Sequence, residues 1–243
     1  MSAESKFPVS EVFHSIQGEG QRAGRPSLFV RLSGCNLRCW WCDTPYTSWK
    51  PEMTPVDAGD IAMRVFDCKA ADVVFTGGEP MLYAAKLAPL VAGLRETGKF
   101  VTIETNGTIY DDAVQPDLWS VSPKLASSTP AIGRGQSGSD TADLVARDLH
   151  VRNLDNGSLY QFSGTAAARQ FKFVVTGHDD LAEVDALVVA HVLAPADVWL
   201  MPEARTRDEV LAKASWLADA CKDRNYNLTL RLHTLMWGQK RGV

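Results

Sequence analysis

The sequence predicts an α/β fold, a partial (β/α) barrel of mainly parallel strands. Short apolar runs rich in β-branched and aromatic residues alternate with longer segments that carry apolar residues at helical spacing. This alternation is typical of parallel β/α units. Chemically distinctive residues recur directly after the predicted strands, where a parallel barrel presents its active site. The 243 residues fit one such domain, spanning residues 1–243.

The predicted strands are apolar runs bounded by glycine, proline or polar residues. They cover residues 28–32, 72–76, 100–103, 118–121, 170–175, 197–200 and 228–232. The predicted helices cover residues 57–68, 83–96, 179–192 and 206–224. Leu87 and Leu94 lie on one stripe of the second helix, and Gly98 follows its end. Thr206 and Glu209 have capping-box spacing, which predicts the start of the last helix.

Two segments fall outside this alternation. Gly18 and Gly20 flank Glu19, which predicts a loop where the backbone approaches a ligand closely. Residues 126–168 are rich in turn-forming residues, with only a hint of a short helix. A connection this long is usually a functional lid or a disordered segment, so we expect a flexible or lid-like insertion.

The composition is that of a globular protein, with 45% hydrophobic and 22% charged residues. A net charge of −4 offers no basic surface for nucleic acid. The first residues lack the apolar run of a signal peptide, and no later stretch is long enough to span a membrane. We therefore expect a cytoplasmic protein without nucleic-acid or membrane partners.

Three cysteines, Cys35, Cys39 and Cys42, lie within eight residues. The other two, Cys68 and Cys221, lie on apolar stripes at helical spacing, so we assign them to the core. Three thiolates can ligate zinc or an iron–sulfur cluster, but a structural zinc site takes four protein ligands. The cysteine loop is therefore predicted to hold a metal centre with one open coordination position.

The spacing of these thiols, with a tryptophan directly before the last, resembles the radical S-adenosylmethionine (SAM) superfamily. The resemblance implies a 4Fe–4S cluster in which Cys35, Cys39 and Cys42 hold three irons and the fourth iron chelates SAM. The alternative is a zinc-stabilised binding module that takes His14 or His233 as the fourth ligand.

Six short motifs sharpen this resemblance. They are Ser15-Ile16-Gln17-Gly18-Glu19-Gly20, Gly24-Arg25-Pro26, Asp43-Thr44, Thr76-Gly77-Gly78-Glu79-Pro80, Glu104-Thr105-Asn106-Gly107 and Ser122-Pro123-Lys124. Together they resemble the 7-carboxy-7-deazaguanine synthase family over nearly the whole chain except residues 126–168. The resemblance implies a lyase that converts 6-carboxy-5,6,7,8-tetrahydropterin to 7-carboxy-7-deazaguanine with loss of ammonia, on the route to queuosine and other 7-deazapurines.

The resemblance also assigns roles to single residues. Those implied to line SAM are Trp41, Cys42, Asp43, Gly78, Ser122, Pro123, Lys124, Met201, Pro202, Glu203 and Ala204. Those implied to contact the pterin are Ile16, Gln17, Gly18, Arg31, Thr76 and the C-terminal residue Val243. Thr44 is implied to bind Mg²⁺, which prefers oxygen ligands.

Two charged residues are candidates for substrate chemistry. Arg31 lies inside an apolar strand, and its guanidinium can hold the substrate carboxylate through two N–H groups. The alternative is an arginine whose head reaches solvent at the strand end. Glu104 is the candidate for proton transfer, and its alternative is a strand-end carboxylate that only accepts hydrogen bonds.

Other partners follow from the superfamily. The resemblance implies a one-electron reductant, such as a flavodoxin or ferredoxin, and a homodimer. The alternative is a different radical SAM class, an activase that forms a glycyl radical on a protein. It would bind SAM at the same carboxyl ends of the strands. The loop at Gln17 and the charge of Arg31 favour a small carboxylated substrate instead.

Overall fold

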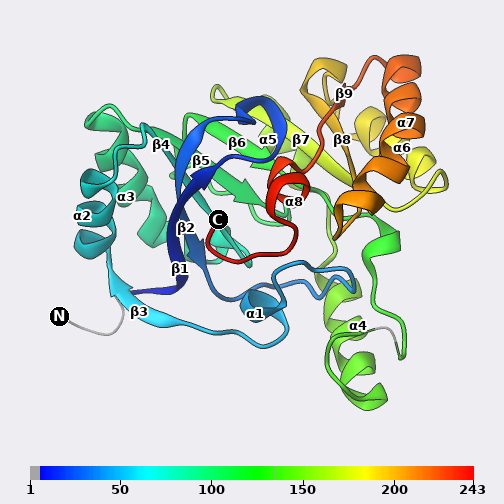
Figure 1. Cartoon of the computed structure of the whole chain (residues 1–243), viewed down its shortest axis with the longest axis horizontal. Helices are drawn as coiled ribbons and strands as arrows, with labels where there is room; N and C mark the ends of the chain where they lie inside the picture. Colours follow the sequence, from blue (N-terminus) through cyan, green and yellow to red (C-terminus); the bar gives the residue numbers. More distant parts are fainter. Residues whose placement is uncertain (1–5, 134) are drawn as a thin grey trace.

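The computed structural model of the chain describes residues 6–133 and 135–243 (Figure 1). Within these residues, one sheet has nine strands. Their order is β3 (Thr54–Asp57), β1 (Lys6–Ile16), β2 (Pro26–Leu32), β4 (Asp72–Gly77), β5 (Phe100–Thr105), β6 (Leu118–Val121), β7 (Ala168–Val175), β8 (Val198–Pro202) and β9 (Asn227–Leu228). All neighbours from β2 to β9 pair in parallel, and the sheet stays open. The predicted partial barrel is therefore confirmed.

The α-helices α1 to α7 lie between strands in the chain, and α8 follows β9. They are α1 (Pro45–Ser48), α2 (Ala58–Asp67), α3 (Ala84–Glu96), α4 (Asp140–Asn153), α5 (Leu159–Gly164), α6 (Asp180–Ala190), α7 (Arg207–Arg224) and α8 (Leu232–Trp237). The four predicted helices correspond to α2, α3, α6 and α7. Thr206 and Glu209 form the predicted capping box at the start of α7. No helix in residues 6–133 or 135–243 combines the length and apolar character needed to cross a membrane.

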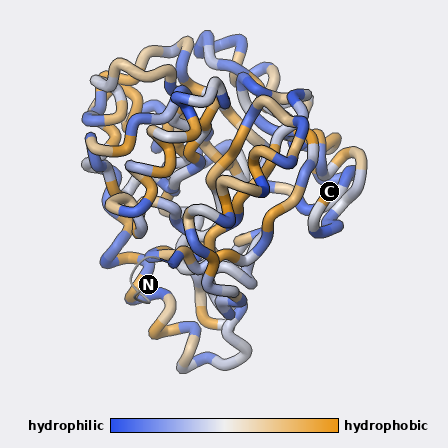
Figure 2. Tube along the Cα trace, turned by 90° about the vertical axis from the view of Figure 1, so that its left-hand side faces the viewer, coloured by the Kyte–Doolittle hydropathy of each residue, from blue (hydrophilic) through white to orange (hydrophobic). Residues whose placement is uncertain are grey.

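The core lies between the sheet and these helices. Apolar side chains of the parallel strands are almost completely buried, among them Val73, Phe75, Ile103 and Phe173. Figure 2 shows hydrophobic segments of the chain running through the middle of the molecule. This packing holds the strands at fixed positions, so the segments that follow their carboxyl ends meet at one rim.

Three points of the strand prediction need correction. The prediction missed β1, the first strand of the chain, and β3, which both lie on the antiparallel side of the sheet: β1 pairs antiparallel with β2 and with β3. Only its first half, with Phe7 and Val9, alternates clearly between buried and half-buried residues. The predicted strand 228–232 ends at Leu228, because the N–H of Leu232 donates to the carbonyl of Gly18 and α8 begins there.

Residues 126–168 contain α4 and α5 instead of one short helix. Leu159 and Phe162 of α5 are fully buried, and the ring of Phe162 lies 5.1 Å from that of Trp119 on β6. Figure 1 shows α4 extending away from the sheet, below α1 and beside the loop that carries the cysteines. Whether this segment acts as a lid stays a prediction.

Candidate active site

A cavity of about 490 Å³ lies at the carboxyl ends of the parallel strands. Residues of β4 to β8, or of the turns after them, line it: Thr76, Glu104, Ser122, Lys172 and Met201. The three clustered thiols and the last residues of the chain line it too. The segments expected on one rim thus surround one cavity.

Cys35, Cys39 and Cys42 line this cavity, whereas Cys68 and Cys221 do not. Burial raises the pKa of Cys35 and of Cys39 to about 12, and burial also raises the pKa of Cys42. Such thiols stay protonated unless metal cations replace their protons. No three His, Cys, Asp or Glu side chains in the described part of the chain are gathered to hold a single ion. Three sulfurs around one cavity suit an iron–sulfur cluster.

Polar groups point at two of these sulfurs. The N–H of Leu37 donates to Cys35 Sγ at 3.4 Å, and Asn106 Nδ2 lies 4.0 Å from the same sulfur. Ser48 Oγ lies 3.3 Å from Cys42 Sγ. Donors near a sulfur favour its anionic form, which is the form that ligates metal.

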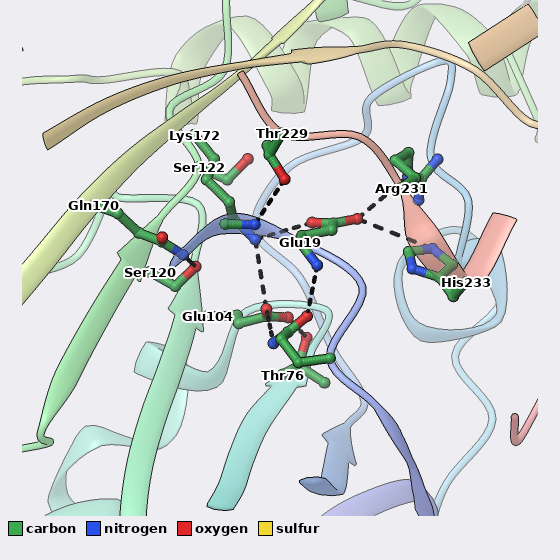
Figure 3. Close-up of polar contacts among 12 residues, drawn as sticks. Glu19, Thr76, Glu104, Ser120, Ser122, Gln170, Lys172, Thr229, Arg231 and His233 are labelled. Atoms are coloured by element: carbon green, nitrogen blue, oxygen red, sulfur yellow. Dashed lines mark hydrogen bonds and ion pairs between the residues drawn. The ribbon is translucent and has the colours of Figure 1, made fainter. Parts of the chain in front are cut away.

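A chain of charged side chains crosses the cavity (Figure 3). Lys172 Nζ lies 2.9 Å from Glu19 Oε2 and 3.4 Å from Glu104 Oε1. Glu19 Oε1 lies 3.2 Å from Arg231 Nε, and Arg231 also pairs with Asp43 beside the thiols. We call these five side chains the charge chain; positive and negative groups alternate along it from Glu104 to the cysteine loop.

Oppositely charged neighbours favour the ionised forms of Glu19, Lys172 and Asp43 in the charge chain. Burial opposes ionisation of Glu19, but the cations of Lys172 and Arg231 hold its pKa below the ordinary value. Burial likewise opposes the charge of Lys172, whose side chain is 3% exposed, but Glu104 and Glu19 hold its pKa above the ordinary value. Asp43 lies at the exposed end of the charge chain, and the Arg231 guanidinium keeps the pKa of its carboxyl below the ordinary value.

Three donors converge on Glu104. Gln17 Nε2 donates to Oε1 at 3.1 Å, Thr76 Oγ1 donates to Oε2 at 2.8 Å, and Lys172 Nζ completes the set. Gln17 and Thr76, two predicted substrate contacts, therefore belong to one hydrogen-bonded unit with the predicted proton-transfer residue.

Arg31 is held inside the molecule. Its Nη1 donates to Glu11 Oε2 at 3.1 Å and to the Tyr46 hydroxyl, and its side chain is 18% exposed. Its Nε is buried without a hydrogen-bond partner in the described structure. The guanidinium therefore pairs with Glu11 beside the cavity and keeps one unpaired donor, and its role in substrate binding stays a prediction.

The C-terminal residues lie against the same group. Val243 lines the cavity, and the guanidinium carbon of Arg241 lies 3.5 Å from the centre of the Tyr46 ring. Arg241 Nε also donates to Glu11 Oε1 at 2.6 Å. Glu11 and Tyr46 thus contact both Arg31 and the tail, which places the end of the chain at the cavity.

Most of the predicted site residues line the cavity. They are Gln17, Gly18, Arg31, Trp41, Cys42, Asp43, Thr44, Thr76, Gly78, Glu104, Ser122, Lys124, Met201, Pro202, Glu203 and Val243. Ile16, Pro123 and Ala204 do not line it. Ile16 ends β1 opposite Pro26, and the buried Ala204 instead offers its carbonyl to Arg231 Nη1 at 2.7 Å.

The loop before β2 approaches α8 closely. A Cβ on Gly18 would lie 2.1 Å from Nδ1 of His233, so no other residue fits there without displacing the histidine. His233 also lines the cavity, although it lies in a helix and does not follow a strand directly. Burial lowers its pKa.

The sequence analysis missed Lys172 and Arg231 and assigned Glu19 only to a glycine-rich loop. Lys172 lies between two buried phenylalanines of β7, and Arg231 lies between two leucines. A charge within an apolar run requires a buried partner, which is the same pattern that indicated a role for Arg31. That pattern identifies the two residues as candidates but not their partners.

Comparisons with known proteins identify the family of the chain. The family model described as the radical SAM superfamily matches residues 29–121, which include the three thiols. The 7-carboxy-7-deazaguanine synthase of Rhodopirellula baltica is 40% identical over 244 residues, with 100% of this chain and 91% of the relative covered. The Halobacterium salinarum synthase of the same name is 43% identical over 240 residues, with 95% and 90% covered.

One solved structure supports the fold. The crystal structure of QueE from Escherichia coli superposes with a TM-score of 0.64 at 24% sequence identity. The match covers 94% of this chain and 95% of that chain.

Proposed function

The chain belongs to the 7-carboxy-7-deazaguanine synthase family, and we propose that the cavity at the strand ends is the site of its reaction. The protein is a radical SAM lyase that converts 6-carboxy-5,6,7,8-tetrahydropterin to 7-carboxy-7-deazaguanine with loss of ammonia. This activity fits a role in queuosine biosynthesis. The observation that carries the site assignment is that the three thiols and the charge chain line the same cavity.

The thiols of Cys35, Cys39 and Cys42 would hold the 4Fe–4S cluster and would leave one of its coordination positions for SAM. When bound, the cluster and SAM supply the one-electron chemistry that starts the reaction. Trp41 is a candidate SAM contact, because its Nε1 is buried without a hydrogen-bond partner in the described structure. Further SAM contacts would come from the other predicted residues that line the cavity, such as Gly78 and Lys124 with its 2.6 Å bond to Ser122 Oγ.

The pterin would lie between Arg31 and Glu104. The unpaired Nε of Arg31 supports a role in binding the substrate carboxylate, since a guanidinium can offer two parallel N–H groups. Glu104, oriented by Gln17, Thr76 and Lys172, would accept a proton from the substrate or hold one of its N–H groups. The tail that ends at Val243 lines the same cavity.

Further components are proposed on the family alone. Thr44 lines the cavity and would offer a hydroxyl oxygen to Mg²⁺. The enzyme uses a one-electron reductant, for which a flavodoxin or ferredoxin is our candidate. We also propose a homodimer, a single radical SAM domain, and a lid role for residues 126–168.

Turnover under anaerobic conditions tests the function. Purified protein with an intact cluster, the carboxytetrahydropterin, SAM, Mg²⁺ and a chemical reductant should release one 7-deazapurine and one ammonia per turnover, measured by mass spectrometry and an ammonia assay. Iron and sulfide should each approach about four per chain, which excludes the zinc-stabilised module as the native form. If cluster-loaded protein forms no 7-deazapurine, the proposed substrate is wrong. The alternative, a radical SAM activase that acts on a protein glycine, would then be favoured.

A further inference from the structure

The loop that carries the three thiols has no helix or strand of its own between Leu32 and Pro45. Inside the loop, the N–H of Cys42 donates to the carbonyl of Cys39 at 3.1 Å. A cluster needs three sulfurs at fixed positions, and a loop without a hydrogen-bonded ladder cannot hold them by itself. Contacts from other parts of the chain must therefore shape it.

Many of these contacts come from the long connection between β6 and β7. The backbone N–H of Trp40 donates to the carbonyl of Ser128 at 3.1 Å, and its indole Nε1 donates to the carbonyl of Ser127 at 2.8 Å. Asn153 Nδ2 donates to the carbonyl of Asn36 at 2.8 Å. The connection thus satisfies both donors and acceptors of the cysteine loop.

Gln136 spans the second half of the loop. Its Nε2 lies 3.0 Å from the carbonyl of Trp40 and 3.0 Å from the carbonyl of Cys42. A side-chain amide nitrogen carries two N–H groups, so both bonds can form together. One half-buried side chain therefore fixes the backbone on both sides of the Trp41 residue that precedes the last thiol.

His150 supports the first half of the loop from α4. It is fully buried, and its Nδ1 accepts the backbone N–H of Arg38 at 3.0 Å. The proton must then sit on Nε2, which donates to Ser128 Oγ at 3.1 Å, and Ser128 donates in turn to the carbonyl of Leu125. Burial, with the charge of Lys124, lowers the pKa of His150 to about 4, so the acceptor persists at neutral pH.

We infer that Gln136 and His150 are positioning residues that hold the cysteine loop in the shape required by its cluster. This inference rests on the proposed assignment of the cluster to Cys35, Cys39 and Cys42, and it gives residues 126–153 a task separate from substrate binding. The connection between β6 and β7 thus fixes the backbone of the cysteine loop, and this role is independent of the proposed lid role.

The rate at which the cluster is lost tests whether Gln136 and His150 position the cysteine loop. Iron release to a chelator is followed by visible absorbance in reconstituted enzyme without SAM, for wild type, Gln136→Leu, His150→Leu and His150→Gln. Gln136→Leu removes two hydrogen bonds at a half-buried position and should release iron about tenfold faster. His150→Leu should do likewise, and His150→Gln, whose amide oxygen can accept the Arg38 N–H, should be slower than His150→Leu.

Val145→Ala, at a 66% exposed position of the same helix, is the matched control and should release iron at the wild-type rate. In His150→Leu the Arg38 N–H loses its acceptor and should exchange faster. In Gln136→Leu the carbonyls of Trp40 and Cys42 lose their donor, and the loosened backbone should raise exchange of the Trp40 N–H, which bonds to Ser128. Unchanged iron release in folded Gln136→Leu, or equal release from His150→Leu and His150→Gln, would overturn the positioning role. A wild-type protein that binds no iron would instead contradict the proposed cluster site.

Discussion

Replacing Lys172 by methionine removes the cation at the centre of the charge chain and nearly keeps the length of the side chain. Glu19 and Glu104, which lie 2.9 Å and 3.4 Å from Nζ, then lose their shared partner. Removing one partner of a buried ion pair costs about 3–5 kcal/mol, and we expect about 3 kcal/mol because Arg231 still pairs with Glu19. For a chain of this size, that loss lowers the thermal midpoint by roughly 6–12 °C.

The assay is thermal unfolding of anaerobic, cluster-loaded enzyme, followed by circular dichroism across pH. The folded-state pKa of Glu19 is lowered, so its stabilisation is complete above its ordinary pKa of about 4.3 and is lost as pH falls toward the folded value. The folded-state pKa of Lys172 is raised, so its stabilisation is complete below about 10.4 and is lost as pH rises through the folded value. The difference between wild type and Lys172→Met should therefore be constant from about pH 5 to about pH 9 and shrink below about pH 4.

Two further variants make the test specific. Lys222→Met removes a lysine that is 74% exposed in its pair with Asp219, and the midpoint should not change measurably. Adding Glu19→Gln to Lys172→Met removes a buried carboxylate that has lost one of its two cation partners and should restore part of the loss. A Lys172→Met enzyme that melts within about 2 °C of wild type at pH 7 would refute the argument, because the buried pair would then contribute almost nothing.

The remaining predictions concern the chemistry. Cys39→Ala should lose both the brown colour and turnover in metal analysis and activity assays, and an active, colourless variant would count against the cluster site. Arg31→Lys cannot offer two parallel N–H groups and should raise the KM for the pterin about tenfold or more, whereas an unchanged KM would argue against carboxylate binding. Thr44→Ala should raise the Mg²⁺ concentration needed for half-maximal activity, and an identical Mg²⁺ titration would exclude the ligand role. Deleting Val243 should raise the KM for the pterin and leave SAM affinity unchanged, and equal loss of both would indicate general damage to the cavity.

Local patterns predicted much of the fold. Helical periodicity and the capping box at Thr206 predicted the bounds of α7 closely. Short apolar runs predicted the bounds of β4 and β6 equally closely. β1 escaped prediction because its pairing with β2 and β3, more than its own alternation, makes it a strand. The predicted end of β9 was wrong because the backbone turns into α8, where the N–H of Leu232 bonds to Gly18, more than 200 residues earlier in the chain.

The sequence by itself determined the kind of chemistry. The three thiols lie so close together in the chain that their spacing alone indicates a metal centre, and the strand–helix alternation indicates where the rim lies. Only the tertiary structure decided the electrostatics of the site. Glu19 and Lys172 are 153 residues apart, and nothing local to either one names the other. The partner of a buried charge depends on which strand ends meet across the cavity, and packing of the whole sheet sets that meeting.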